Sequence, residues 1–514
     1  QFLSQTELSA RFGPSPADYQ QVLAYLQTQG FQLAQGSTNR LTQTVRGSRA
    51  QAEQAFAVHI GDYQIGNSSF YANDTDPTLA SAIAAHIHAV VGLANLATPR
   101  PMNQQVPPTC GGGTLIDGTT SPETGQSCPP DPCDVIEAGS ILRPICKFFA
   151  PLQGLLKALG NIIPQAPGRA NSAVQSPAFD GSGQTIGLLE FDSFHRQDVA
   201  NFLNLTGLAA NQIDHLTEVP VNGGATLGAG ESEVLLDIDS VLILAPGANI
   251  AVYDGPSASS FQQLFNAIIN GGATVISNSW AYCENETTLS DVQSLDAILQ
   301  SAAASGISVF NGTGDSGSTC LDGSPDTIAV PADSPSATAF GGTSTTFGSG
   351  FTYGTESWWD GIDDIPTTGQ GGFGTSVFFA RPTYQNGANS SSMRSLPDVV
   401  VLADPADGIS ICQADAGGCP TGLIYGGTSL AAPIWSAIAA LLNQELGINA
   451  GALNAAVYPL AGTGVFHDPA VLRSDFAHVG LGSPNLDRLY LALAQHSVGA
   501  PSSRASTVSA DISF

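Results

Sequence analysis

The sequence predicts an α/β fold in which a doubly wound parallel sheet follows a small α+β domain. Three observations lead to this prediction. At 514 residues, the chain is too long for a single hydrophobic core. From residue 184 onward, short apolar strands alternate with helical segments, a pattern typical of a parallel sheet covered by helices on both faces. Residues 1–98 mix helical and alternating stretches and are nearly neutral, whereas the remainder holds almost all of the formal charge of −28.

The composition excludes several classes of function. With 43 acidic and 15 basic residues, the chain lacks the basic surface that binding to nucleic acid or to an anionic membrane requires. No apolar run is long enough to span a bilayer. Only 11% of the residues are charged and the pI is near 4.2, which suits a protein that works in acid. The chain begins at Gln1 and has eight cysteines without a CxxC motif, so we expect a secreted protein with disulfides whose signal peptide has been removed.

We divide the chain into four segments: an α+β domain at 1–98, a linker rich in Pro, Gly and Cys at 99–178, the parallel-sheet domain at 179–500 and a tail at 501–514. The predicted elements of the first domain are helices at 16–29, 48–58 and 78–96 and strands at 31–34 and 61–71. An amphipathic stretch at 141–163 in the linker is predicted to be a helix that packs on a neighbour.

The parallel sheet is predicted from short apolar stretches separated by helical segments. These stretches are residues 185–190, 249–253, 274–277, 308–311 and 328–331. In an open α/β sheet, ligands bind beyond the carboxyl ends of the strands. We therefore expect the functional residues in the segments that follow these strands.

Ser429 is the first candidate for chemistry. Residues 425–446 begin with a Gly-Gly-Thr-Ser turn and continue as a long apolar helix, so Ser429 would lie at a helix N-terminus, where unpaired N–H groups favour developing negative charge. Acyl transfer to a serine requires such donors. An ordinary N-cap serine is the alternative. The same tetrapeptide ending at Ser344 precedes a strand pattern and is predicted to be structural, and Ser316 lacks the all-β setting of a trypsin-like nucleophile.

No histidine lies in the sequence setting of a subtilisin-type catalytic base, so a base must come from elsewhere. Glu233 and Asp237 are four residues apart at the head of a predicted helix and share one helix face. If they are buried together, they share a proton, and a carboxylate can act as a base in acid, where imidazole is protonated. A solvated acidic first turn is the alternative.

Together these residues resemble the sedolisin family, the serine-carboxyl peptidases, and in particular its kumamolisin-like members with their propeptide. The resemblance covers residues 1–98 and 179–495 and implies a subtilisin-like sheet preceded by a ferredoxin-like α+β prodomain. Further matches to the family lie at 183–186, 279–280, 341–343, 382–385 and 394–398.

The resemblance implies a role for each candidate residue. Ser429 matches the family's nucleophile, Glu233 its base and Asp237 the carboxylate that orients the base. Asp315 matches the oxyanion-hole aspartate, which would be protonated there. The positions that extend the carboxylate network in kumamolisin-like members are Glu190 and Trp280.

The family also carries a structural Ca²⁺ in a C-terminal loop. The matching loop is shortened here, and within it Asp468 and Asp475 are the carboxylates that would bind the ion, with backbone carbonyls completing the shell. Loss of the site is the alternative.

We therefore expect a secreted, acid-active serine-carboxyl endopeptidase in its proenzyme form, a monomer that binds polypeptide substrates and has its own propeptide as an intramolecular inhibitor. Part of the linker at 101–178 is expected to lie across the active-site cleft. A catalytically silent relative that binds peptides is the alternative in another class. A neutral subtilisin-type protease is the alternative mechanism, and the missing histidine argues against it.

Two further expectations concern stability and activation. Adjacent parallel strands would bring Cys283 and Cys320 to one rim of the sheet, so we expect these two to pair; Cys412 would close a local hairpin with Cys419, and the linker cysteines would pair among themselves. We also expect ion pairs between the five arginines of residues 1–100 and the acidic remainder of the chain, which acid would weaken.

Overall fold

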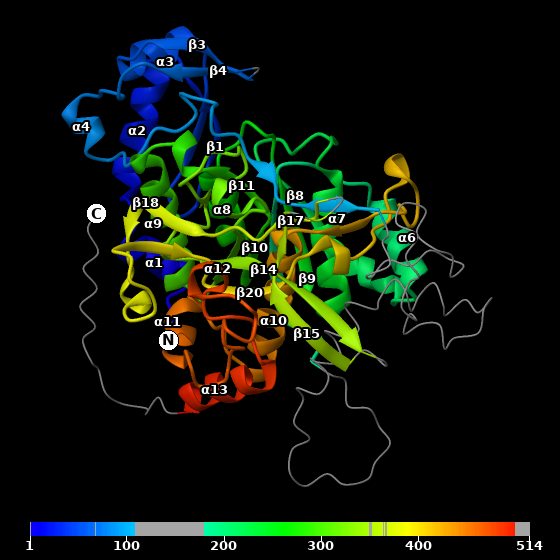
Figure 1. Cartoon of the computed structure of the whole chain (residues 1–514). Coiled ribbons are helices and arrows are strands. Elements are labelled where there is room, and N and C mark those ends of the chain that lie inside the picture. The colour runs from blue at the N-terminus through cyan, green and yellow to red at the C-terminus, as the bar shows by residue number, and fades with distance from the viewer. Residues whose placement is uncertain are drawn as a thin grey trace.

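The computed structural model describes residues 2–66, 68–107, 179–348, 352–362, 364 and 367–498. The predicted linker helix, the linker cysteines and the C-terminal tail lie outside these residues. We call residues 2–98 the prodomain and residues 179–498 the body. In Figure 1 the greater part of the prodomain, in blue, lies beside the body at the top of the view.

The body is built around one sheet. Its strands are β7 (Thr185–Glu190), β8 (Leu216–Pro220), β9 (Asn249–Asp254), β10 (Val275–Asn278), β12 (Ser308–Gly312), β14 (Thr338–Gly348), β15 (Thr352–Trp358) and β20 (Val399–Leu402). The order is β15-β14-β12-β10-β7-β9-β8, with β20 also paired to β14. Every pair is parallel except β14–β15. The predicted parallel sheet is confirmed.

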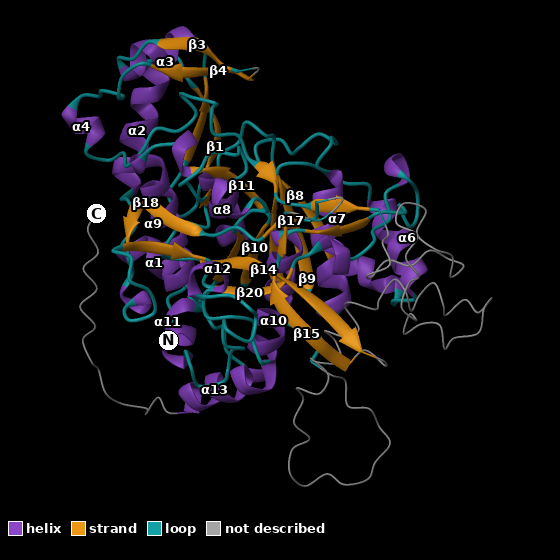
Figure 2. Ribbon diagram, in the orientation of Figure 1, coloured by secondary structure: helices purple, strands orange, loops and turns teal. Residues whose placement is uncertain are grey.

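Helices cover both faces of this sheet (Figure 2). One hydrophobic core includes α6 (Arg196–Thr206), α7 (Glu231–Leu244), α10 (Thr428–Leu446) and α13 (Leu486–Val498), and a second includes α8 (Phe261–Gly271) and α9 (Leu289–Ala304). The central strand β7 alternates between them: Leu188 belongs to the first core and Leu189 to the second. This period of two is what a strand buried on both faces requires.

Shorter elements complete the body. They are β11 (Trp280–Cys283), β13 (Ala329–Val330), β16 (Asp360–Gly361), β17 (Gly369–Gln370), β18 (Gly374–Ala380), β19 (Met393–Leu396), β21 (Ile424–Gly426), α11 (Asn454–Val457) and α12 (Phe476–Val479). The segment after the prodomain contributes β5 (Arg100–Pro101), which pairs with β11, and β6 (Gln104–Val106), which pairs with β21. No helix among the described residues is long and apolar enough to cross a membrane.

The strand predicted at 328–331 does not join the parallel sheet. The residues form β13, which pairs antiparallel with β11. Pro331, directly after β13, has no N–H to donate to a ladder, so this stretch is poorly suited to the interior of a sheet. The next strand, β14, takes the place beside β12 instead.

The prodomain is an α+β unit, as predicted. Its elements are α1 (Gln5–Arg11), α2 (Pro16–Thr28), β1 (Gln32–Gly36), β2 (Gln43–Arg46), α3 (Arg49–Phe56), β3 (Ile60–Ile65), β4 (Ser68–Asn73) and α4 (Ser81–Ala84). The strands pair as two antiparallel sheets, β1–β2 and β3–β4.

The helix predicted at 78–96 is wrong except for α4. Asn95 instead bonds to the backbone of β4: its side chain accepts from the N–H of Tyr71 at 2.7 Å, and its own N–H donates to the Tyr71 carbonyl at 3.1 Å. This pairing, with Ile83 and Leu93 buried, replaces the helical hydrogen bonds that the spacing predicted. Tertiary contacts override local propensity here.

Uncharged polar groups join the prodomain to α8 of the body. Asn39 donates to Asn266 at 2.5 Å, Asn266 donates to Thr42 at 2.8 Å, and Thr38 donates to Asn270 at 2.7 Å. Amides and hydroxyls of this kind do not titrate. The described residues therefore do not bear out an interface of arginine–carboxylate pairs.

The prodomain arginines are engaged in other ways. Arg49 pairs with Asp62 of the same domain at 2.6 Å, Arg40 donates to carbonyls of the same domain, and Arg46 donates to Asn222. Among the described residues, the single ion pair between the body and the chain that precedes it is made by Arg100, which follows the prodomain, with Glu286.

Two predicted disulfides are present. Cys283, at the end of β11, is bonded to Cys320 in the segment after β12, with 6.2 Å between their Cα atoms. Cys412 is bonded to Cys419 and closes a hairpin. Both pairings are confirmed.

Candidate active site

The carboxyl ends of three adjacent strands meet at one edge of the sheet. Strand β7 ends with Glu190, β10 leads into Ser279 and Trp280, and β12 leads into the loop of Asp315. Helices α7 and α10 pack against each other behind this edge. The topology thus brings together residues that lie far apart in the sequence.

Helix α7 begins next to the end of β7 because Asp192 accepts hydrogen bonds from the N–H groups of Gly228 and Gly230, both at 2.7 Å. Glu233 and Asp237 lie within the first two turns, and both are fully buried. The alternative of a solvated acidic helix start is therefore wrong. The apolar residues on every side of α7 explain the burial, since a helix that is hydrophobic all round lies inside the protein.

The carboxyls are held by a small set of donors. The Ser279 hydroxyl contacts both oxygens of Asp237, at 2.9 and 3.0 Å, and the indole N–H of Trp280 donates to Glu190 at 2.7 Å. Among the described residues, neither oxygen of Glu233 accepts a hydrogen bond.

Burial and mutual repulsion make these carboxyls weak acids. Burial, with repulsion from Asp237, raises the pKa of Glu233 and of Glu190 well above the ordinary value. Burial also raises the pKa of Asp237, and the Ser279 hydroxyl partly offsets this. The nearby hydroxyl of Ser429 likewise offsets part of the rise at Glu233. The site thus retains protons at a pH where ordinary carboxyls have lost them.

Ser429 is the second residue of α10 and is fully buried. The N-cap is Gly427, which has a φ of 99° and no side chain, so Ser429 is not an ordinary N-cap serine. Its hydroxyl is directed at the carbonyl of Ser279, at 3.5 Å. Its N–H donates to the carbonyl of Met102 at 3.2 Å.

Asp315 lies beside the same helix end. Its Oδ1 accepts from the N–H of Thr428 at 2.7 Å and from the Thr428 hydroxyl at 2.9 Å, and that hydroxyl accepts from the N–H of Gly314. Its Oδ2 is buried and makes no hydrogen bond of good geometry among the described residues, although the Gln104 side chain lies near enough to the carboxyl to lower its pKa. Burial raises the pKa of Asp315 to about 7, although the bonds from Thr428 oppose the rise. A protonated carboxyl with a free Oδ2 can donate a hydrogen bond.

The structure therefore gathers all six residues that the sequence assigned to this site. The sequence did not predict roles for Thr428 and Asp192. Thr428 comes directly before the candidate serine and Asp192 lies just after the end of β7, and these positions could have identified them. Ser344 lies in β14 and donates to Asp404 at 2.5 Å, which supports a structural role.

One other group of residues has the composition of a metal site. Among the described residues, His195, Asp198 and Glu231 place one ligand atom each within 4.8 Å of the others. These atoms already have partners: Glu231 accepts from His195 and from Gln413, and Asp198 accepts from the N–H of Ala414. The group fastens the disulfide hairpin 412–419 to α6 and α7.

Both predicted calcium ligands accept hydrogen bonds within their own loop. Asp468 accepts from the N–H of Ala470 at 2.9 Å, and Asp475 accepts from the N–H of Ala477 at 2.9 Å and pairs with the His478 ring at 2.7 Å. Backbone carbonyls of the loop also close its own turns: those of residues 468, 469 and 470 accept from N–H groups within it. These bonds engage one oxygen of each carboxylate, and calcium binding stays a prediction.

Comparison with known families identifies two regions of the chain. Residues 1–96 match the model of the pro-kumamolisin activation domain, and residues 221–455 match the model of the subtilase family.

Individual relatives match over most of the chain. Kumamolisin from Bacillus sp. (strain MN-32) is 28% identical over 529 residues, covering 96% of this chain and 86% of that protein. Sedolisin from Pseudomonas sp. (strain 101) is 27% identical over 477 residues, covering 89% of this chain and 74% of that protein. The solved structure of Pseudomonas sedolisin, a serine-carboxyl proteinase complexed with pseudo-iodotyrostatin, has a TM-score of 0.54 at 25% identity and covers 63% of this chain and 95% of that one.

Proposed function

The chain belongs to the sedolisin family of serine-carboxyl peptidases, and from this premise we propose that it is the proenzyme of a secreted endopeptidase that works in acid through a Ser-Glu-Asp triad. The observation that carries the proposal is the burial of Glu233, Asp237 and Asp315 around Ser429, where the described part of the chain gives these four residues no histidine partner. Carboxyl groups of raised pKa suit proton transfer in acid.

In the acylation step, the Ser429 hydroxyl turns from the Ser279 carbonyl toward Glu233 and attacks the carbonyl carbon of the scissile bond. In the enzyme molecules whose carboxyl cluster has lost one proton, Glu233 accepts the hydroxyl proton and returns it to the leaving amine. Asp237 lies one turn further along α7 and stabilises the protonated form of Glu233. A water molecule then attacks the acyl-enzyme with the same groups in the reverse roles, so that the products are a carboxylic acid and an amine.

The oxyanion is stabilised by two donors, the N–H of Ser429 and a protonated Asp315. The free Oδ2 of Asp315 supports this role because it is buried and lacks a partner among the described residues. Above the pKa of about 7, a carboxylate at this position would repel the oxyanion. Glu190 and Trp280 are positioning residues in this scheme. They act through Asp237 and favour protonation of the carboxyl cluster.

The prodomain acts as an intramolecular inhibitor in this proposal. The segment of residues 100–106 supports the role, because it crosses the site as an extended strand and contacts Ser429 directly. A peptide that occupies the site excludes other substrates.

Hydrolysis of a denatured protein tests the function. The acidified chain should cleave denatured casein at pH 4 and lose this activity toward pH 8, and the Ser429→Ala variant should be inactive throughout. An optimum near pH 8 would contradict the proposal. Calcium binding is tested separately, by comparing the Tm in Ca²⁺ with that in EDTA.

A further inference from the structure

The segment that follows the prodomain crosses the site in the geometry of a bound peptide (light blue in Figure 1). On one side, Arg100 and Pro101 pair antiparallel with Ala281 and Trp280 at the start of β11. On the other side, the strand β6 pairs antiparallel with β21, which leads into the Gly-Gly-Thr-Ser turn. Strand addition of this kind is a general mode of peptide recognition.

The peptide bond between these two strands lies at Ser429. Met102 donates its N–H to the Ser279 carbonyl at 3.1 Å, and the Met102 carbonyl accepts from the N–H of Ser429 at 3.2 Å. Asn103 extends to the other side, where its side chain donates to Ser232 at 3.2 Å. The Met102 carbonyl is thus the group presented to the serine.

The space around Gly427 shows how closely Met102, Asn103 and Asp315 approach one another. A Cβ on this glycine would collide with the Met102 carbonyl oxygen, with Oδ2 of Asp315 and with the Cα of Asn103. The Met102 carbonyl oxygen, which accepts from the N–H of Ser429, therefore lies close to the unpartnered carboxyl oxygen, as an oxyanion hole requires.

We propose that Met102–Asn103 is the bond that the proenzyme cleaves first, and that the pocket holding Met102 selects unbranched apolar side chains before the scissile bond. This inference rests on the proposed function. Ser429 Oγ bonds to the Met102 carbonyl carbon, the bond to the Asn103 nitrogen breaks, and Glu233 passes the serine proton to that nitrogen. Water then releases residues 1–102 with a C-terminal carboxyl group and regenerates the serine.

The pocket explains the selectivity. Met102 is 1% exposed. The cluster around it consists of Ala281, Ile328, Ala329, Ala332, Ala339 and Leu396. A Cβ on Gly312 would lie 2.9 Å from the terminal methyl group of Met102, so the pocket is long because its walls carry small side chains. These residues are apolar, and Arg394 and Asp398, which bind the backbone of the cluster, pair with each other, so a charged side chain buried there would lack a free partner.

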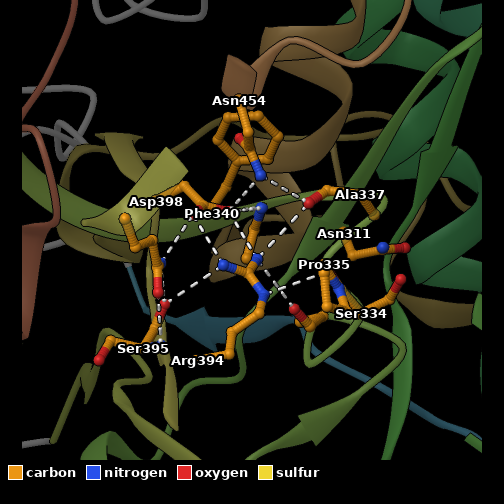
Figure 3. A network of polar contacts seen from close by, with 12 residues as sticks. Asn311, Ser334, Pro335, Ala337, Phe340, Arg394, Ser395, Asp398 and Asn454 are labelled. Atoms are coloured by element: carbon orange, nitrogen blue, oxygen red, sulfur yellow. Dashed lines mark hydrogen bonds and ion pairs between the residues drawn. The ribbon is translucent and has the colours of Figure 1, made fainter. Parts of the chain in front are cut away.

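A buried ion pair between Arg394 and Asp398 binds the backbone next to this cluster (Figure 3). Arg394 pairs with Asp398 at 2.7 Å and donates to the carbonyls of Ala332, Ser334 and Ala337. Asp398 in turn accepts from the N–H of Ala339 at 2.9 Å. These bonds hold the backbone of Ala332 and Ala339, two members of the cluster, so the shape of the pocket is set before a substrate enters.

The first test is the site of processing. The purified chain is acidified, and its products are followed by intact mass and N-terminal sequencing. The first new N-terminus should be Asn103, with Ser429→Ala unprocessed. A first cut at another bond, with Ser429→Ala still intact, would overturn this inference and leave the proposed function standing. If Ser429→Ala is also processed, the proposed function fails.

The second test needs no variant to fold. Synthetic peptides of residues 98–107 carry Met, norleucine or Glu at the position of Met102 and are incubated with the activated enzyme. We expect cleavage after this position, with norleucine within about threefold of Met in kcat/KM and Glu lower by about 100-fold or more. Equal cleavage of the Met and Glu peptides would overturn the selectivity. Cleavage of casein without cleavage of the Met peptide after this position would overturn the assigned bond.

Discussion

The hydrogen-bonded carboxyl groups of the prodomain and the deeply buried ones of the body respond to acid in opposite ways. In the prodomain, Glu7 and Asp62 are solvent-exposed and Glu53 is half-buried, and hydrogen bonds from a backbone N–H or from Arg49 lower their pKa. In the body, burial raises the pKa of Glu233, Asp315 and many others. The first set favours the folded state only when ionised, and the second only when protonated.

Linkage turns this difference into a prediction about stability. A carboxyl group whose pKa is lower in the folded state than in the unfolded state stabilises the fold above its unfolded pKa. This stabilisation is lost as the pH falls through the folded pKa. A carboxyl group whose pKa is higher in the folded state stabilises the fold below its unfolded pKa. This stabilisation is lost as the pH rises through the folded pKa. Acid should therefore loosen the prodomain while it stabilises the body. The amide-rich interface between them adds little pH dependence, since its groups do not titrate.

The largest expected effect comes from removing the nucleophile. Ser429→Ala should lower kcat/KM by about 10⁶-fold and leave the chain at full length in acid, because no acyl-enzyme can form. Mass spectrometry after incubation at pH 4 measures this. Acid should still loosen the prodomain of the variant, which hydrogen exchange detects. Equal protection of the prodomain from hydrogen exchange at pH 4 and pH 7 would contradict the predicted difference between the prodomain and the body.

The next effect comes from Asp315, whose protonation should set the alkaline limit of activity. Asp315→Asn keeps a donor that does not titrate, so the decline in kcat/KM near pH 7 should flatten while the value at pH 4 falls by about tenfold. Asp315→Ala is the matched control and should lose about 100-fold or more. An unchanged alkaline limb in Asp315→Asn would assign that limit to another group.

A smaller effect is expected at Asp239, a body carboxyl outside the site. Both of its oxygens are buried without a partner among the described residues, and burial, with repulsion from Asp198, raises its pKa. Asp239→Asn should melt several degrees above its parent at pH 7.5 and match it at pH 3. The measurement is calorimetry in the Ser429→Ala background. A variant less stable than its parent at pH 7.5 would show that Asp239 does not favour the folded state in its protonated form.

The smallest effect is expected at Asp62, the counterpart in the prodomain. Asp62→Asn removes the exposed ion pair with Arg49, so hydrogen exchange in the prodomain should rise slightly at pH 7 and match the parent at pH 3. The sign of its pH dependence is opposite to that of Asp239→Asn. Faster exchange at pH 3 than at pH 7, relative to the parent, would contradict the assignment.

The sequence predicted the parts of this molecule that depend on local periodicity. Helix α7, with Glu233 and Asp237 on one face, and helix α10, with Ser429 in its first turn, follow from apolar spacing and a glycine turn. The carboxyl ends of parallel strands then place Asp315 nearby, as topology requires. The candidate site residues could be predicted from the sequence because few residue types can perform this chemistry.

The remainder depends on contacts between distant segments. The helix predicted at 78–96 is replaced by bonds between Asn95 and Tyr71, which no local pattern signals. Likewise β5 and β6 are short and lie in a stretch rich in Pro and Gln, so their strand character comes from β11 and β21 alone. The arginine interface was expected from net charge, but net charge does not tell which surface groups meet.

The pairing of β6 with β21 has a kinetic consequence if the chain is cut after Met102. Residues 1–102, with β5, are then held only by noncovalent contacts and escape on dilution. Strand β6 stays joined to the body through the same chain, so its local concentration is independent of how far the sample is diluted. Activity measured after dilution should rise to a plateau below its final value. The remaining rise should be first order and independent of enzyme concentration, unless a further cut between molecules removes the tethered strand.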